Sequence, residues 1–281
     1  MSIIDRHYHL LRRLHSLSGV FPVGLFLLPH LTTNSSIVWG NFLGKADISI
    51  KQAVETAGGD VKEVAFSHAG VETFQHEVDF IHSLPALEII EWLVLFGPIA
   101  FHAGLGIVFA QTGKSNVHRY GWNGSLRYAL QRMTGYLAVA FIFLHITSLR
   151  FGWEYWGLMP KFDTAHAASS LAIHFQQGGV GLLLAAFYLV CVLAIVFHFA
   201  NGLWSAAITW GLTVSRAAQS RWGYACAALG LGLSTMAVAA IVGYSTLDIE
   251  AAQQIEDQMH QAAPKSMSVL PAAPLSRGAF S

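Results

Sequence analysis

The sequence predicts an all-α integral membrane protein, a bundle of five transmembrane helices, and its composition supplies the first evidence. Of the 281 residues, 54% are hydrophobic and only 11% are charged, whereas soluble domains have about 25% charged residues. The mean hydropathy is +0.48, and five apolar runs reach about 20 residues, the length that crosses the hydrocarbon core of a bilayer. The net charge of zero argues against a nucleic-acid partner.

We expect these helices to form one domain over residues 1–247. Their predicted ranges are 14–33, 87–111, 126–150, 178–210 and 224–244. The fourth range is longer than the hydrocarbon core is thick, so one end should project into water. Three prolines lie inside the first two helices, where the missing N–H predicts kinks. They are Pro22, Pro29 and Pro98.

Two segments are expected outside the bundle. Residues 34–86 form a long outer loop, in which residues 48–57 and 61–74 fit short helices lying over the outer face. Residues 248–281 turn polar and then become rich in Ala, Pro and Ser, which predicts a flexible tail that is not part of the core.

The basic residues predict the orientation, because cytoplasmic segments of membrane proteins carry an excess of Lys and Arg. With the N-terminus inside, the only inner carboxylate is Asp5, and the acidic residues collect in the outer loops. We therefore expect a cytoplasmic N-terminus and an external C-terminus. The inner basic residues are Arg6, Arg12, Arg13, Lys114, Arg119, Arg127, Arg132, Arg216 and Arg221.

Four of the predicted helices each carry one inward-placed histidine, away from the helix ends, where an ionisable side chain is costly and usually marks a site. His30 and His145 lie about 24 and about 28 Å from the inner ends of the first and third helices, at 1.5 Å per residue. His102 lies about 22 Å from the outer end of the second helix, and His198 is similarly far along the fourth. Because neighbouring helices run in opposite directions, the first two share an outer level and the last two an inner level.

Two histidines at one level on two helices are what bis-imidazole ligation of a haem iron requires. The two levels therefore predict two stacked b-type haems, the outer one held by His30 and His145 and the inner one by His102 and His198. No Cys-x-x-Cys-His run is present for covalent attachment. Each imidazole should donate its second N–H to a carbonyl or hydroxyl. Five glycines would let a flat macrocycle or another backbone approach: Gly24, Gly104, Gly106, Gly135 and Gly202.

A histidine inside a bundle can also be a hydrogen-bonding packing residue and nothing more. That interpretation suits any one of the four taken alone. It does not explain why all four fall into two pairs of matched depth, so we favour iron ligation. The other ten histidines lie at helix ends, in loops or in the tail, where interfacial roles are expected.

Several stretches of the sequence together resemble a known family. The most specific are His198-Phe-x-Asn-Gly-Leu-Trp-Ser205 and Thr209-Trp-Gly-Leu-Thr213, with support from residues 12–31, 83–103 and 130–145. Through them the chain resembles the five-helix, dihaem cytochrome b membrane-anchor subunit of succinate dehydrogenases and fumarate reductases, the succinate:quinone oxidoreductases.

The resemblance implies a function and partners. The axial ligands would be the same four histidines in the same pairs, and no catalytic residue would lie on this chain. Flavoprotein and iron–sulfur subunits would dock on its cytoplasmic face in the bacterial cytoplasmic (inner) membrane. Electrons from succinate would pass through the iron–sulfur subunit, the inner haem and the outer haem to a membrane quinone, with menaquinone expected. The direction would reverse in a fumarate reductase.

Other polar residues near the two levels are further candidates. Haem propionates are anionic, and arginine suits carboxylates, although the arginines fit equally well as positive-inside anchors. The candidate propionate partners are Arg12, Arg13, His15, Ser16 and Arg132. Glu88 and Glu91, at the outer end of the second helix, are candidate proton carriers for a quinone, with a solvated helix start as the competing interpretation.

Two other functions stay open on the sequence alone. One is the dihaem cytochrome b subunit of another membrane oxidoreductase, of hydrogenase or nitrate reductase type, although the run from Asn201 to Ser205 points away from it. The other is a haem-free membrane anchor or transporter with four packing histidines.

Overall fold

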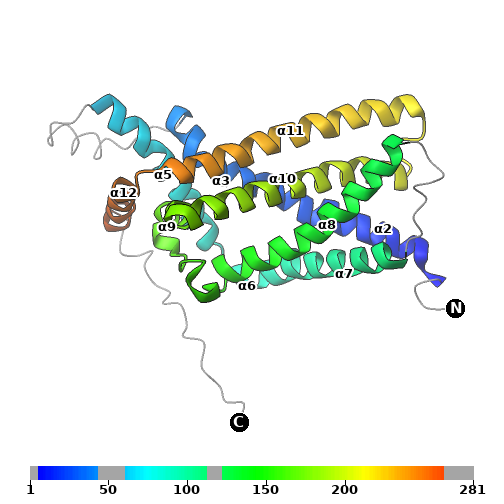
Figure 1. Cartoon of the computed structure of the whole chain (residues 1–281), viewed down its shortest axis with the longest axis horizontal. Coiled ribbons are helices and arrows are strands. Elements are labelled where there is room, and N and C mark those ends of the chain that lie inside the picture. Colours follow the sequence, from blue (N-terminus) through cyan, green and yellow to red (C-terminus); the bar gives the residue numbers. More distant parts are fainter. Residues whose placement is uncertain (1–5, 44–60, 113–121, 263–281) are drawn as a thin grey trace, which may run out of the picture.

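The structure is a computed structural model that describes residues 6–43, 61–112 and 122–262. Every regular element in these ranges is helical (Figure 1). Five helices of the described part are long and apolar enough to cross a membrane, which confirms the predicted all-α, five-span architecture. They are Tyr8–Phe42, Leu87–Thr112, Leu126–Leu149, Gly178–Thr209 and Arg216–Thr246.

The first and fifth spans are longer than predicted, because their helices continue through polar residues beyond the apolar run, and the other three lie close to the predicted ranges. The first consists of α2 (Tyr8–Ser18), the π-helical turn η1 (Gly19–Gly24) and α3 (Leu25–Leu43). The second consists of α6 (Leu87–Ile90), the π-helical turn η2 (Glu91–Phe96) and α7 (Gly97–Thr112). The others are α8 (Trp122–Leu149), α10 (Gly178–Thr209) and α11 (Arg216–Thr246).

The first span is interrupted at a proline, as predicted. Phe21 has extended backbone angles (φ −137°, ψ 120°) directly before Pro22, because the proline ring excludes the preceding residue from the α region. In the second span the π-helical turn η2 ends just before Pro98. Pro29 lies inside α3, which continues as a helix on both sides of it; a kink at this position stays a prediction.

The spans α8 and α10 pack together in the middle of the bundle, and α11 and α7 lie at its opposite edges (Figure 1). The helix α10 packs against α8 and α11, and α11 packs in turn against α3. The helix α7 packs mainly against α2, and none of its residues is buried by the rest of the chain. Of the five spans, the one that contains α7 is therefore the least buried by the rest of the described chain, although it carries His102, whereas α11 is partly buried against α3 and α10.

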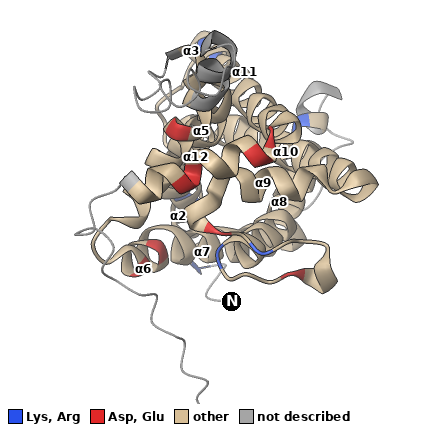
Figure 2. Ribbon diagram, turned by 90° about the vertical axis from the view of Figure 1, so that its left-hand side faces the viewer, with Lys and Arg blue, Asp and Glu red and all other residues tan. Residues whose placement is uncertain are grey.

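The two ends of the bundle differ in charge. We call the end at which α2 begins and α10 ends the basic end, and the opposite end the acidic end. Figure 2 looks onto the acidic end and shows Asp and Glu residues on α5, α6 and α12. Among the described residues, the basic end has no carboxylate and seven arginines: Arg6, Arg12, Arg13, Arg127, Arg132, Arg216 and Arg221. The basic end is the one that the sequence predicts to face the cytoplasm.

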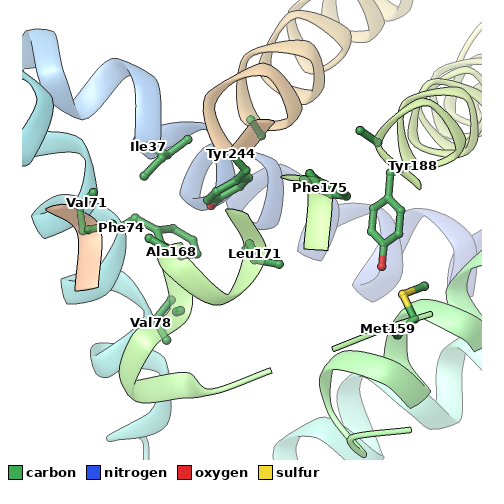
Figure 3. Close-up of a cluster of buried hydrophobic side chains, with 14 of the residues drawn as sticks. Ile37, Val71, Phe74, Val78, Met159, Ala168, Leu171, Phe175, Tyr188 and Tyr244 are labelled. Carbon is green, nitrogen blue, oxygen red and sulfur yellow. The ribbon is translucent and has the colours of Figure 1, made fainter. Parts of the chain in front are cut away.

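The largest core of the described chain lies at the acidic end (Figure 3). There α5 (Val61–His82), α9 (Ala167–Gln176) and α12 (Ile249–Ala262) cover the ends of α3, α10 and α11. Short 3₁₀ turns, η3 (Tyr155–Gly157) and η4 (Thr164–His166), lead into α9. The converging side chains include Ile37, Val71, Phe74, Leu171, Phe175 and Tyr244.

Two buried polar side chains hold α9 in this cap. Glu256 of α12 is fully buried, and its carboxylate accepts hydrogen bonds from the backbone N–H groups of Ala168 (2.8 Å) and Ser169 (3.2 Å) and from the Ser169 hydroxyl (2.6 Å). The amide oxygen of Gln75, from α5, accepts from the N–H of Ala167 (3.1 Å). The first N–H groups of a helix lack intrahelical partners. In α9, side chains of α5 and α12 accept the hydrogen bonds of these groups.

The helix α12 corrects the prediction of a flexible tail from residue 248. Its residues Ala252 and Ile255 are 1% and 2% exposed, and with Met259 they form an apolar face at helical spacing that packs on the cap core. The high share of polar residues in this segment hid that face. The Ala-, Pro- and Ser-rich part, residues 263–281, lies outside the described residues.

The outer connection also differs from a simple loop. The first span continues to Leu43, and α5 is a helix of 22 residues where residues 61–74 were predicted as helical. The helix α5 packs closely on α3, since Gly70 lies against the Ile37 carbonyl and its N–H donates to Asn41 Oδ1 (2.7 Å). The helix predicted at residues 48–57 lies outside the described residues.

We predict that the attachment of α12 weakens at alkaline pH. His166 Nε2 lies 3.0 Å from Asp257 Oδ1 and its Nδ1 lies 3.1 Å from Asp163 Oδ2. The bond to Asp257, and also that to Asp163, raises the pKa of His166 above 6.5 despite its partial burial. A raised folded-state pKa means that the stabilisation is complete below the ordinary pKa and is lost as the pH rises through the raised value.

Hydrogen exchange followed by mass spectrometry checks this prediction. After correction for the intrinsic exchange rate, amides of α12 should exchange severalfold faster at high pH than below pH 6.5, and His166→Gln should remove the difference. The variant His82→Gln, on α5, should keep it. An unchanged pH dependence in His166→Gln would contradict the assignment.

Candidate metal centre

The outer level contains His30 of α3 and His145 of α8 as neighbours. Their ring centroids are 5.8 Å apart, and their planes cross at 84°. Each ring stacks on an aromatic ring four residues earlier on its own helix, His30 on Phe26 at 5.2 Å and His145 on Phe141 at 5.5 Å. Residues four apart share a helix face, so each helix carries its own aromatic support for the imidazole.

The inner level contains His102 of α7 and His198 of α10. Their ring centroids are 6.2 Å apart, with planes crossing at 89°. A third imidazole joins them, because His15 of α2 stacks on His102 at 4.0 Å with an angle of 8° between the planes. The two pairs that lie together are those expected from depth along the helices.

The inner imidazoles have the second hydrogen bond that the sequence predicts. His102 Nδ1 lies 2.8 Å from the His15 carbonyl, and His198 Nδ1 lies 3.1 Å from the Gln131 carbonyl. A carbonyl only accepts, so Nδ1 carries the proton in both rings and Nε2 keeps a free lone pair. His15 Nδ1 in turn lies 3.1 Å from the His102 carbonyl, which makes the contact between α2 and α7 reciprocal.

The outer pair lacks this feature. His145 Nδ1 is buried and has no hydrogen-bond partner within the described chain, so the predicted second bond is wrong for this residue. The rings nearest to it are those of Phe141, Tyr188 and His30. An aromatic environment fixes the position of the imidazole by packing, whereas the inner level fixes it by hydrogen bonds.

The spacing of both pairs fits two imidazoles on one metal. An imidazole nitrogen binds a metal at about 2 Å, and the ring centre lies about 1 Å farther out, so two rings on opposite sides of a metal have centroids about 6 Å apart. The observed distances are 5.8 and 6.2 Å. The described residues contain no group of three or more His, Cys, Asp or Glu that could hold a metal ion. A metal held by only two residues needs further ligands of its own, as a porphyrin supplies.

Two glycines leave the space that the inner imidazole rings occupy. A Cβ at Gly19 would collide with the His102 ring, and one at Gly135 would lie 3.0 Å from His198 Cε1. Gly135 was among the glycines singled out from the sequence, whereas Gly19 was missed. The signal for Gly19 was its place at the end of the run from Arg12, one of the stretches that carry the family resemblance.

The other predicted glycines have mixed surroundings. A Cβ at Gly24 would collide with the Phe199 ring, and one at Gly106 would lie 3.2 Å from His15 Cε1. A Cβ at Gly202 would lie 3.6 Å from Gln131 Nε2, and one at Gly104 would have no atom within 4 Å. Close approach therefore explains Gly24 and Gly106 but not Gly104.

A chain of hydrogen bonds from the run after His198 supports the inner level. Asn201 Oδ1 accepts from Arg127 Nε (3.0 Å), and its Nδ2 donates to Gln131 Oε1 (2.7 Å). Gln131 Nε2 donates to the carbonyl of His198 (3.1 Å), and the guanidinium of Arg127 lies 4.0 Å from the Trp204 ring. Asn201 therefore joins α10 to α8 beside the imidazole.

The candidate propionate partners are only partly brought together. Arg12 and Arg13 line one cleft at the basic end, with Tyr8, His9 and Thr209. Ser16, on the same helix, is half-buried. Arg132 does not line this cleft; it donates to the Tyr128 hydroxyl (3.0 Å) on its own helix. A propionate role for these residues stays a prediction.

At the acidic end, Glu91 is engaged in an ion pair. Its carboxylate accepts two hydrogen bonds from Arg150 Nε (3.1 and 3.0 Å) and lies 2.9 Å from Arg150 Nη2. This pair fastens the second span to the end of α8. Glu88, three residues earlier, is exposed. A role of either residue in proton transfer stays a prediction.

Comparison with known proteins identifies the family. The chain is 32% identical over 234 residues to the "Succinate dehydrogenase cytochrome b558 subunit" of Bacillus subtilis (strain 168), a match that covers 83% of this chain and 95% of the relative. The chain belongs to the family of succinate dehydrogenase cytochrome b membrane subunits. With its five apolar spans, it is a multi-pass protein of the bacterial inner membrane. No family model and no solved structure matches the chain.

We predict that Asn201→Ala destabilises this cytochrome b subunit. The substitution leaves Arg127 Nε and Gln131 Oε1 without their partner, and an unsatisfied buried polar group costs about 1–3 kcal/mol. Thermal unfolding in detergent should show a lower midpoint. Ser205→Ala is the matched control, because the Ser205 hydroxyl is exposed and bonds only to the Gly202 carbonyl of its own helix. Equal midpoints in the two variants would contradict the bridging role of Asn201.

Proposed function

We propose that the chain is the membrane-anchor and electron-transfer subunit of a succinate:quinone oxidoreductase. It would link a partner iron–sulfur subunit to membrane quinone by two haem b groups, with succinate chemistry on a partner flavoprotein subunit. The observation that carries the proposal is the occurrence of two crossed imidazole pairs, at two levels, on four different spans of a succinate dehydrogenase cytochrome b subunit.

The residues that would hold the haems follow from the two pairs. His30 and His145 would be the axial ligands at the acidic end, and His102 and His198 those at the basic end. When bound, each haem supplies a one-electron carrier whose potential depends on its ligands, hydrogen bonds and burial. The Nδ1–H bonds of His102 and His198 hold those rings in the tautomer with a free Nε2 and make them more basic ligands.

The different surroundings of the two pairs support different roles. Hydrogen bonds to both inner imidazoles raise their basicity, whereas the outer pair lies among aromatic rings. Greater ligand basicity and burial both change a haem potential, so the two haems should titrate separately. Two carriers of unequal potential suit a chain that moves single electrons between a protein partner at one end and a quinone at the other.

The charge of the two ends supports the placement of the partners. The described part of the basic end has arginines and no carboxylate, which suits the docking of water-soluble subunits on the cytoplasmic side. Arg12 and Arg13 would also lie near the propionates of the inner haem. At the acidic end, the cap formed by α5, α9 and α12 covers α3, α10 and α11, whereas α6 and η2 have no buried residue. We place quinone access beside α6, near Glu88.

The histidine pairs make a specific prediction. The wild-type chain, purified with its partners, should contain two haem b, and each of His30→Leu, His145→Leu, His102→Leu and His198→Leu should lose one. The double variant His30→Leu/His145→Leu should still hold one haem, because both changes affect the same site. The double variant His30→Leu/His102→Leu should hold none. Pyridine haemochrome assays and redox-titrated spectra measure the haem content.

The control and the assay complete this test. His82→Leu, on α5 outside both levels, should retain two haems and succinate-dependent quinone reduction, whereas the four single variants should lose most of that activity. Two haems retained in any of the four single variants would refute the assignment of that residue. A colourless wild-type protein would refute the haem proposal, and haem without succinate activity would favour another membrane oxidoreductase.

We also predict that Gly19→Ala disturbs the inner haem alone. The added methyl group would collide with the His102 imidazole, and such overpacking costs about 1–3 kcal/mol. Redox-titrated spectra should show the inner haem lost or shifted in potential, with the outer haem unchanged. Gly104→Ala is the matched control, since among the described residues no atom outside the backbone of its own helix lies within 4 Å of the added methyl group. Equal effects of the two variants would contradict the role given to Gly19.

A further inference from the structure

A cleft of about 510 Å³ lies at the basic end between α8, α10 and α11, outside the two histidine levels. Its lining includes two arginines from different helices, Arg127 and Arg216, together with the polar residues Gln219 and Ser220. Its aromatic residues are Trp204 and Tyr224. Tyrosine and tryptophan are enriched where a membrane meets water, which fits the depth of this cleft at the end of the spans.

The described lining has two cations and no anion to neutralise them. Arg127 uses Nε for Asn201 and lies over the Trp204 ring, while its two terminal nitrogens make no hydrogen bond within the described residues. The stacking on Trp204 and the bond to Asn201 hold the guanidinium in place. A guanidinium fixed in this way presents its remaining N–H groups in a fork that matches a phosphate or carboxylate.

An apolar stripe leads away from the cleft along α11. The cleft residues Ser220, Tyr224 and Ala227 and the next residue of the same face, Leu231, are all exposed, at the spacing of one helix face. Tyr224 is 75% exposed and Leu231 71%. The exposed face continues through Val238 and Val242. A free phosphate ion would make no contact with this apolar stripe, whereas the acyl chains of a lipid would lie along it.

We propose that this cleft binds the phosphate headgroup of an anionic phospholipid, with the acyl chains along the exposed face of α11. Arg127 and Arg216 hold the phosphate from two helices, and Gln219 and Ser220 offer hydrogen bonds to its glycerol. The site is specific for a negatively charged diacyl lipid, because the basic cleft and the apolar stripe are both needed. It ties the peripheral span α11 to α8, beside the network that supports His198. The proposal does not depend on the haem or the partners.

Native mass spectrometry of the full chain in a non-ionic detergent tests the proposal. The chain is titrated with phosphatidylglycerol and, separately, with the zwitterionic lipid phosphatidylcholine. We expect one phosphatidylglycerol to bind in preference to phosphatidylcholine. Arg216→Gln should weaken this binding about fivefold, the effect of removing one arginine beside an anionic lipid. Arg216→Lys should restore most of it, and size-exclusion profiles and melting temperatures check that each variant is folded.

Arg221→Gln is the matched control, since it removes one arginine from the same helix outside the cleft lining. It should leave the binding of phosphatidylglycerol unchanged, and millimolar inorganic phosphate should not displace the lipid. Equal losses in Arg216→Gln and Arg221→Gln would mean a general attraction to the basic end and would overturn the proposal. Displacement by inorganic phosphate would mean a simple anion site, and equal binding of phosphatidylcholine would mean a lipid site without charge selection. Either result would also overturn it.

Discussion

The structure depends on one constraint, that a polar imidazole inside an apolar bundle is costly unless its hydrogen-bonding nitrogens have partners. The inner level meets it for one nitrogen of each ring with a carbonyl from a neighbouring helix, the His15 carbonyl for His102 and the Gln131 carbonyl for His198. The remaining nitrogen of each ring, Nε2, is the one that would bind a metal. The same hydrogen bonds draw α2 to α7 and α8 to α10. Packing of the helices and the chemistry of the site therefore have a common cause.

The two ends of the molecule differ in how they are packed. At the acidic end, Glu256 and Gln75 satisfy the N-terminal N–H groups of α9, and a buried core joins α5 and α12 to the spans. This cap packs on the ends of α3, α10 and α11, which are the ends nearer to His30 and His145. In the part that the structure describes, the basic end has no such core and instead has arginine-lined clefts, which suits the partners and the lipid that we propose.

Much of this could be predicted from the sequence, for physical reasons. Five apolar runs gave the five spans, because the bilayer fixes the length of a spanning helix. Matched depths gave the pairs His30 with His145 and His102 with His198, because helix rise is nearly constant. The stacking of His15 on His102 and the bridge through Asn201 could not be derived, since they depend on how far each helix rotates about its axis. The run that contains Asn201 was recognised as specific, but only the structure gives a reason for it.

The misses share a cause in local composition. The helix α12 has a polar sequence, and its apolar face of three residues became visible only against the cap. The ion pair of Glu91 with Arg150 could not be foreseen, because the two residues are distant in the sequence. Each of these outcomes depends on a tertiary contact that no local pattern encodes.

The most direct test of the central claim is low-temperature electron paramagnetic resonance of the oxidised protein, purified with its haem. The imidazole planes cross at 84° in one pair and 89° in the other, and crossed axial imidazoles give a low-spin ferric signal of unusually large anisotropy. We predict two such signals, with different potentials in a redox titration. A single signal, or a high-spin signal that shows iron with one protein ligand, would contradict two bis-histidine sites.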